Sequence, residues 1–222
     1  DSYNIGIGFG AGFAVTTGIR NTLIGSLAGD ALTDADYNVA MGYASLSTDT
    51  LGSRNVAIGF AALEDQNFTT ATDSYNTAVG HAAGTNVTTG VQNTLIGGLA
   101  GDALTDADYN VAIGTDALHS DTLGSRSLAI GRRALYTQNF TTATDSYNIG
   151  IGFGAGFAVT TGVNNTLIGG LAGDALTVGN SNVAIGKDAL TTDTKGDRNV
   201  AIGNASLGTQ NFTTSIDAYN VA

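Results

Sequence analysis

The sequence predicts an all-β fold, a parallel β-solenoid or β-roll of stacked 17-residue coils in which every fourth coil has 21 residues. Three observations lead to this prediction. A five-residue motif, Asn-x-x-x-Gly, recurs at fixed spacing along the chain. Large and small apolar residues alternate within the motif, as they do on a β-strand. The chain has 32 glycines and no proline, and only 12% of its residues are charged, against about 25% in ordinary soluble domains.

The spacing of the motif sets the coil length. Complete copies begin at Asn4, Asn21, Asn38, Asn55, Asn76, Asn93, Asn110, Ser127 (in place of Asn), Asn148, Asn165, Asn182 and Asn199. The spacings run 17, 17, 17 and 21 and then recur, so the higher period is 72 residues. Near-identical units are natural in a stack, where each coil meets a copy of itself. We expect a single repeat array over 1–222, a fragment of a longer fibre, with super-repeats at about 4–75, 76–147 and 148–219.

Each motif predicts one short strand. In the copy that begins at Asn110, Val111 and Ile113 flank the small residue Ala112. The fourth motif position is large and apolar in every complete copy, which predicts that it faces a core. The middle position is Gly, Ala or Leu, which predicts close packing on the opposite face. The closing Gly suits a positive φ or a close approach of two backbones. A helix is disfavoured, because Gly and β-branched residues are poor helix formers.

Stacking in register would place equivalent residues in columns. The Asn column predicts an amide ladder from coil to coil; the alternative is that each Asn only caps its own turn. The residue before the motif alternates between Tyr and Arg through much of the chain, as at Tyr37 and Arg54. This alternation predicts guanidinium groups lying between aromatic rings in cation–π contacts. The alternative is a solvated face without special contacts.

The 21-residue coils carry candidate ligand-contact loops, because their four extra residues fall in segments that contain Gln-Asn-Phe-Thr-Thr. The candidate contact residues are Gln66, Asn67, Phe68, Gln138, Asn139, Phe140, Gln210, Asn211 and Phe212. Loops displayed every fourth coil, roughly 19 Å apart at the usual strand spacing, would bind a repetitive ligand with avidity. The alternative is that each Phe folds back and covers the core.

Charge and composition exclude several function classes. The net charge of −11 repels phosphate backbones, so we expect no nucleic-acid partner. No apolar run approaches the roughly 18 residues of a membrane span, so none is expected in this segment. No arrangement of nucleophile, base and orienting group is apparent, so the sequence predicts neither an enzyme nor a cofactor. The glycine-rich segment 6–12 is not expected to bind a dinucleotide, because no helix is predicted to follow it.

Metal binding is also weakly indicated. Asp30, Asp34 and Asp36 form an acidic loop whose oxygens could hold calcium, and the same acids recur 72 residues later. The sequence fits neither the calcium-binding nonapeptide repeat nor an EF-hand, so a solvated loop is the favoured interpretation. His81 and His119 have no equivalents in other coils and are expected at surface positions. We therefore predict no metal site.

The motif resembles a known repeat. Asn-Val-Ala-Ile-Gly-x-x-Ala, found at 55–62, 110–117 and 182–189, is similar to the head repeat of trimeric autotransporter adhesins and of related phage and bacterial surface fibres. The resemblance covers essentially the whole chain. It implies a left-handed parallel β-roll, a homotrimer with three chains side by side, and binding to host surfaces or matrix receptors. The coils here are longer than the family's commonest coil, and the 72-residue super-period looks more like a shaft than a specialised head.

The expected function is that of a structural or adhesive segment of an extracellular fibre, at a cell surface or on a virion. Such a segment would space or present a host- or surface-binding tip, in a phage tail fibre or a bacterial adhesin. One alternative is a binding module whose repeated side loops contact a receptor or glycan directly. Another is a single-chain solenoid that assembles into a filament.

Overall fold

The structure, a computed structural model, describes residues 2–222 and confirms a parallel β-solenoid of about 13 coils spaced by about 17 residues. Within this range no helix occurs. The chain divides into two compact units, Asp1–Tyr109 and Asn110–Ala222. The division falls inside the second predicted super-repeat, so the arrangement in 72-residue super-repeats stays a prediction.

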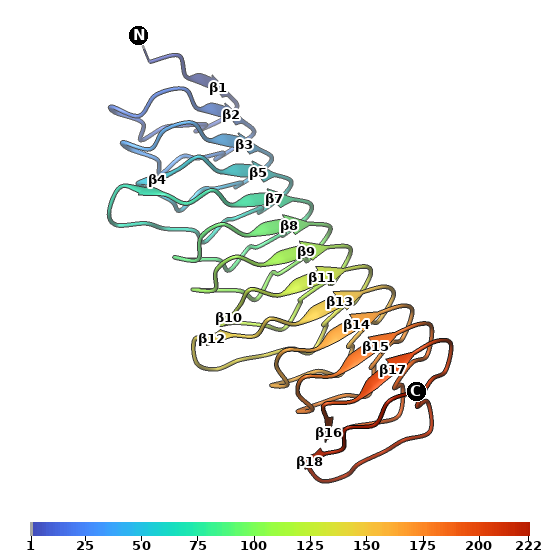
Figure 1. The fold of residues 1–222 in the computed structure, drawn as a ribbon. Helices are drawn as coiled ribbons and strands as arrows, with labels where there is room; N and C mark the ends of the chain where they lie inside the picture. Colours follow the sequence, from blue (N-terminus) through green and yellow to red (C-terminus); the bar gives the residue numbers. More distant parts are fainter. Residues whose placement is uncertain (1) are drawn as a thin grey trace. The chain divides into compact units, whose positions relative to one another are not determined.

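Each unit contains one parallel sheet of three-residue strands, one strand per coil (Figure 1). In the first unit the order is β1 (Ile5–Ile7), β2 (Thr22–Ile24), β3 (Val39–Met41), β5 (Val56–Ile58), β7 (Thr77–Val79) and β8 (Thr94–Ile96). In the second unit it is β9 (Val111–Ile113), β11 (Leu128–Ile130), β13 (Ile149–Ile151), β14 (Thr166–Ile168), β15 (Val183–Ile185) and β17 (Val200–Ile202). Neighbouring strands pair motif position with motif position, as Ile5 does with Thr22.

Three smaller two-stranded sheets join each 21-residue coil to the coil before it. They pair β4 (Gly52–Ser53) with β6 (Thr72–Asp73), β10 (Gly124–Ser125) with β12 (Thr144–Asp145), and β16 (Gly196–Asp197) with β18 (Ile216–Asp217). All three pairs are parallel. The longer coils therefore return to the register of the stack after their extra residues.

Backbone conformation limits the main strands to three residues. The residue before each motif, such as Arg54, has a left-handed φ near +60° (64° at Arg54). The Gly that closes each motif has a φ between 124° and 144°, which L side chains rarely adopt. These glycines also lie against the next coil: a Cβ on Gly42 would be 2.2 Å from the carbonyl oxygen of Gly59. The sequence prediction for this Gly is thus confirmed on both counts.

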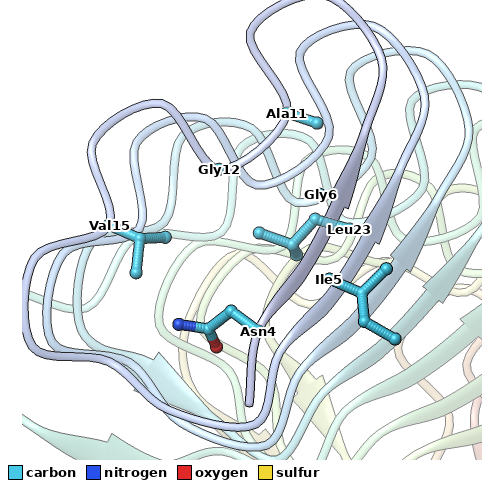
Figure 2. A pocket seen from close by; sticks show the side chains of 7 residues that line it. All are labelled: Asn4, Ile5, Gly6, Ala11, Gly12, Val15 and Leu23. Carbon is cyan, nitrogen blue, oxygen red and sulfur yellow. The ribbon is translucent and has the colours of Figure 1, made fainter. Parts of the chain in front are cut away.

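The prediction of which strand face is the core was wrong. The middle motif residue is buried, as at Leu23 (1% exposed) and Ala57 (0%), whereas the flanking positions point outward and are partly exposed. Figure 2 shows Leu23 and Val15 inside the first coil and Ile5 on the other side of its strand. The interior is too narrow for two large apolar residues per strand, so the small middle position faces inward.

Large and small residues alternate inside the coils so that the interior is filled. Where the middle strand residue is Leu23, the facing turn has Gly29, whose added Cβ would be only 2.8 Å from the Leu23 side chain. Where the middle residue is Ala40 or Ala57, the equivalent turn position is the fully buried Leu46 or Leu63. One leucine per layer therefore fills this part of the core, which matches the close packing of protein interiors.

The Asn column forms the predicted ladder and also closes each coil. In the coil of Asn165, the side-chain Nδ2 donates to the carbonyl oxygen of Gly179 in the same coil at 2.8 Å. The side-chain Oδ1 accepts the backbone N–H of Asn182 from the next coil at 3.0 Å. The Nδ2 of Asn182 also lies 3.2 Å from this Oδ1. The two interpretations of the sequence therefore both hold, because one amide satisfies a turn carbonyl and a neighbouring coil.

Candidate functional site: an assembly face and the repeated loops

The outward face of each sheet is apolar and carries no charge. In the first unit it consists of Ile5, Ile7, Thr22, Ile24, Val39, Met41, Val56, Ile58, Thr77, Val79, Thr94 and Ile96. In the second unit it consists of Val111, Ile113, Leu128, Ile130, Ile149, Ile151, Thr166, Ile168, Val183, Ile185, Val200 and Ile202. We call these side chains the outer strand face. Several are more than a third exposed, including Met41 (38%) and Ile96 (37%). A continuous apolar surface of this kind marks an interaction site in soluble proteins.

The Tyr and Arg residues that precede the motifs form the predicted cation–π column. The guanidinium of Arg54 lies 4.8 Å from the ring centroid of Tyr37 and 5.7 Å from that of Tyr75. Arg54 Nε also lies 2.9 Å from Asp73 Oδ2. Arg20 contacts the Tyr3 and Tyr37 rings in the same way. Charge is therefore gathered in a column of its own, beside the outer strand face.

The 21-residue coils are fastened by a buried carboxylate from the preceding coil. Asp49 is fully buried and its Oδ1 accepts the backbone N–H groups of Gly52 and Phe68 at 3.0 and 3.1 Å. Its Oδ2 accepts Gln66 Nε2 at 2.6 Å. Gln66 Oε1 in turn accepts Asn76 Nδ2 at 2.8 Å. This chain of hydrogen bonds connects three successive coils through the interior.

The same cluster occurs twice in the second unit, around Asp121 with Gln138 (2.5 Å) and around Asp193 with Gln210 (2.6 Å). Burial raises the pKa of the Asp49 and Asp121 carboxyl groups above the ordinary value, and the hydrogen bonds that these carboxylates accept oppose this shift. All the printed partners are donors, which suits an ionised carboxylate. We call these three sets the Asp–Gln clusters.

The structure places most of the candidate ligand-contact residues in the interior. Gln66 and Gln138 are fully buried, and Phe68 and Phe140 are 6% and 5% exposed. Gln210 and Phe212 are partly buried, Asn67 is partly buried, and Asn139 and Asn211 are exposed. For Phe68 and Phe140 the alternative is confirmed, since both rings cover the core. Ligand contact by these loops stays a prediction, and only their Asn and Thr side chains reach the surface in this structure.

Sequence reasoning missed the Asp–Gln clusters, although the repeat holds a signal for them. Asp49 and Gln66 occupy the same column position as Val15 and Leu32 in the two preceding coils. Leu32 is fully buried. Because the column faces inward at its apolar members, the Asp and Gln in it should face inward as well. Aligning whole coils, instead of the motifs alone, would have shown this.

The acidic loops use their carboxylates within the stack. Asp34 Oδ1 accepts the Thr17 hydroxyl at 2.6 Å, and Asp36 Oδ1 accepts the Ile19 N–H at 2.8 Å. No group of three or more His, Asp or Glu side chains suited to a metal occurs among residues 2–222. His81 stacks on Phe60 and His119 on Tyr136, with centroid distances of 5.1 and 5.0 Å.

Two broader observations complete the description. In the described part of the chain, no helix has the length and hydropathy needed to cross a membrane. No protein family, curated protein or solved structure matches the chain.

Proposed function

We propose that the chain is a segment of an extracellular fibre, at a cell surface or on a virion, in which three copies lie side by side through their outer strand faces. In this proposal the segment spaces or presents an adhesive tip and performs no catalysis. The similarity of the motif to trimeric adhesin repeats supports this assembly and a left-handed coil. Each copy contributes a folded solenoid and an uncharged apolar surface.

The observation that carries the proposal is the outer strand face. Nine of its twelve positions in the first unit and eleven of twelve in the second are apolar, and the others are Thr. Leaving such a surface in water is unfavourable by about 25 cal/mol for each Å². A partner that covers this face therefore stabilises the protein.

A second copy of the same chain is the partner that fits this face best. Its coils repeat at the same axial spacing, about 4.8 Å, so every coil can meet an equivalent coil. A partner with another axial repeat would meet successive coils at different heights. The net charge of −11 opposes association, but the outer strand face itself holds none of that charge.

Charge placed in the outer strand face tests the assembly. Ile58→Asp and Ile96→Asp, singly and together, would bury carboxylates between chains and should reduce the sedimenting species to one 22.3 kDa chain. Thr70→Asp, in an exposed loop, adds the same charge and should leave the assembly intact. Unchanged sedimentation of the double variant, or equal dissociation by the loop variant, would overturn the proposed interface.

The fibre's location is tested separately. An antibody raised against the folded segment should label intact cells or particles without permeabilisation. Labelling that appears only after permeabilisation would contradict an extracellular fibre.

Direct ligand contact by the repeated loops is the second candidate, favoured by the exposed Asn139 and Asn211 at a 72-residue interval. Changing Phe68, Phe140 and Phe212 would not test it cleanly, because two of these rings are buried. Replacing the three loop Asn residues by Ala leaves the core untouched. This variant should lose attachment to its surface if the loops bind, and should retain it if the segment is only a spacer.

A further inference from the structure

A cavity on the first unit lies outside every feature described above. It is lined by Phe9, Gly10, Phe13, Leu27 and Asp30 and has a volume of about 240 Å³. The first three residues belong to the turn after β1, and the other two belong to the equivalent turn after β2. This position separates the cavity from the interior of the first coil, which Asn4, Val15 and Leu23 line (Figure 2).

The walls of the cavity are two aromatic rings. Phe9 and Phe13 are 82% and 86% exposed, so neither ring is used in the core. Gly10 lies between them with a φ of 70°, and a Cβ there would be 3.1 Å from Leu27 Cδ2. The absence of a side chain at Gly10 therefore lets Leu27 from the next coil form an apolar floor between the rings.

The cavity holds one acidic group, Asp30. Its Oδ1 is sealed from solvent, and among the described residues no donor lies within hydrogen-bonding distance of it. A carboxylate with one oxygen removed from water is screened less than an exposed one, so it attracts a nearby cation more strongly. The cavity thus combines two aromatic rings, an aliphatic floor and an incompletely satisfied negative charge.

The second unit contains the same residues with internal partners. Phe153, Phe157, Leu171 and Asp174 are the equivalents of Phe9, Phe13, Leu27 and Asp30. There the guanidinium of Arg132 lies 5.9 Å from the Phe153 ring centroid. The Thr191 hydroxyl donates to Asp174 Oδ1 at 2.5 Å. The chain therefore pairs this type of ring with a cation and this carboxylate with a donor.

We propose that the cavity of Phe9, Phe13, Leu27 and Asp30 binds an organic cation, an alkylammonium or guanidinium group carried on an apolar stem. The cation would lie against the rings and donate to Asp30, and the stem would cover Leu27. Aromatic faces and a carboxylate together recognise such ligands. The net charge of −11 draws cations toward the surface and disfavours anions.

Nuclear magnetic resonance titration of the ¹⁵N-labelled whole chain tests the proposal. Phenethylammonium should shift the amide signals of Gly10, Leu27 and Asp30, and 2-phenylethanol, a neutral probe of similar shape, should bind about tenfold more weakly, as expected when a charged hydrogen bond and a cation–π contact are lost. Nα-acetyl-arginine amide distinguishes the two sources of such a group. Its binding extends the site to a partner's side chain, and binding of phenethylammonium alone assigns free amines.

The variants separate the cavity from general charge attraction. Asp30→Asn should weaken phenethylammonium binding about tenfold, and Phe9→Leu, which keeps an apolar wall, about threefold. Asp34→Asn removes the same charge from the same coil but lies outside the cavity, and should leave the affinity unchanged. Equal binding of the charged and neutral probes, absence of binding by both cations, or equal losses in Asp30→Asn and Asp34→Asn would overturn the proposal.

Discussion

At the scale of single residues, the closing Gly of each motif is the least replaceable position. Gly169 has a φ of 132°, and a Cβ there would be 2.5 Å from the carbonyl oxygen of Gly186. Both atoms belong to the backbones of stacked coils, so neither can yield without moving a coil. Its neighbour Gly170 has no atom within 4 Å of an added Cβ, and the equivalent residue in the first unit is Ser26. Two adjacent glycines therefore serve different purposes.

This difference gives a matched pair of substitutions. Gly169→Ala should lower the free energy of unfolding by more than about 2 kcal/mol, because the strain of the positive φ adds to the clash. Gly170→Ala should change it by less than about 0.5 kcal/mol. Chemical denaturation of both variants measures the difference. Equal stabilities would contradict the close approach of the coils at Gly169.

The buried carboxylates predict a dependence of stability on pH. The pKa of Asp49 and Asp121 is raised by burial in the folded chain, so the folded state holds these protons to a higher pH than the unfolded state does. Their contribution to stability is therefore complete below the unfolded pKa of 3.8 and is lost as pH rises through the folded value. Acidification from neutral pH should strengthen this part of the fold.

Asp49→Asn isolates that contribution, because the variant has no titrating group at this position. The thermal midpoint of the unsubstituted chain should rise relative to that of Asp49→Asn as the pH is lowered from neutral toward 4. Other carboxylates are common to both proteins and cancel in the comparison. A difference that stays constant over this range would show that the raised pKa of Asp49 has no consequence for stability.

At the scale of elements, the Asn ladder is what fastens one coil to the next. Asn165 satisfies two groups, the carbonyl of Gly179 and the N–H of Asn182. In the 21-residue coil the situation differs, since Asn55 Nδ2 has no partner among the described residues. In the second unit Ser127 replaces the ladder Asn and is held by the Ser146 hydroxyl at 2.6 Å and by Gln138 at 2.7 Å.

Substitution by Ser should therefore depend on the coil. Asn165→Ser leaves two buried backbone groups without partners and should cost about 2 to 4 kcal/mol. Asn55→Ser should cost less than about 1 kcal/mol, because Ser74 and Gln66 are placed to repeat the second unit's arrangement. Denaturant unfolding compares the two variants. If Asn55→Ser proved as damaging as Asn165→Ser, the ladder would not act through these hydrogen bonds.

Most elements were predictable from the sequence, and the side that each strand turns inward was not. Motif spacing gave the coil length and the strand positions, because both depend on local residue types. Ala112 and Ile113 are both apolar, however, so alternation marks two faces without saying which is enclosed. The space inside a coil decides this, and it depends on residues such as Leu46 that come from the opposite turn. The inward direction of Asp49 and Gln66 has the same origin.

At the scale of the whole molecule, the order of coils matters as much as their number. A 17-residue coil and a 21-residue coil are both removable without breaking the Asn spacing. Deleting 20–36 joins Ile19 to Tyr37, and the Asn column continues. Deleting 54–74 also keeps the column, but it removes the Gln66 and Phe68 donors that Asp49 needs.

We expect the two deletions to differ clearly in thermal stability. The chain without 20–36 should fold with a modestly lower midpoint, since it loses one layer of core. The chain without 54–74 should lose about 3 to 5 kcal/mol more, the usual cost of leaving a buried charge without its partners. Circular dichroism during heating compares them. Equal midpoints would mean that the Asp–Gln clusters do not hold the long coils in place.

The proposed assembly is the central claim at this scale, and the solution mass of the unsubstituted segment tests it most directly. Light scattering after size exclusion should give about three times the chain mass of 22.3 kDa, because three outer strand faces are covered only when three copies meet. A mass of one chain, stable across the concentration range, would contradict the trimeric fibre and leave a single-chain solenoid whose outer strand face remains in water.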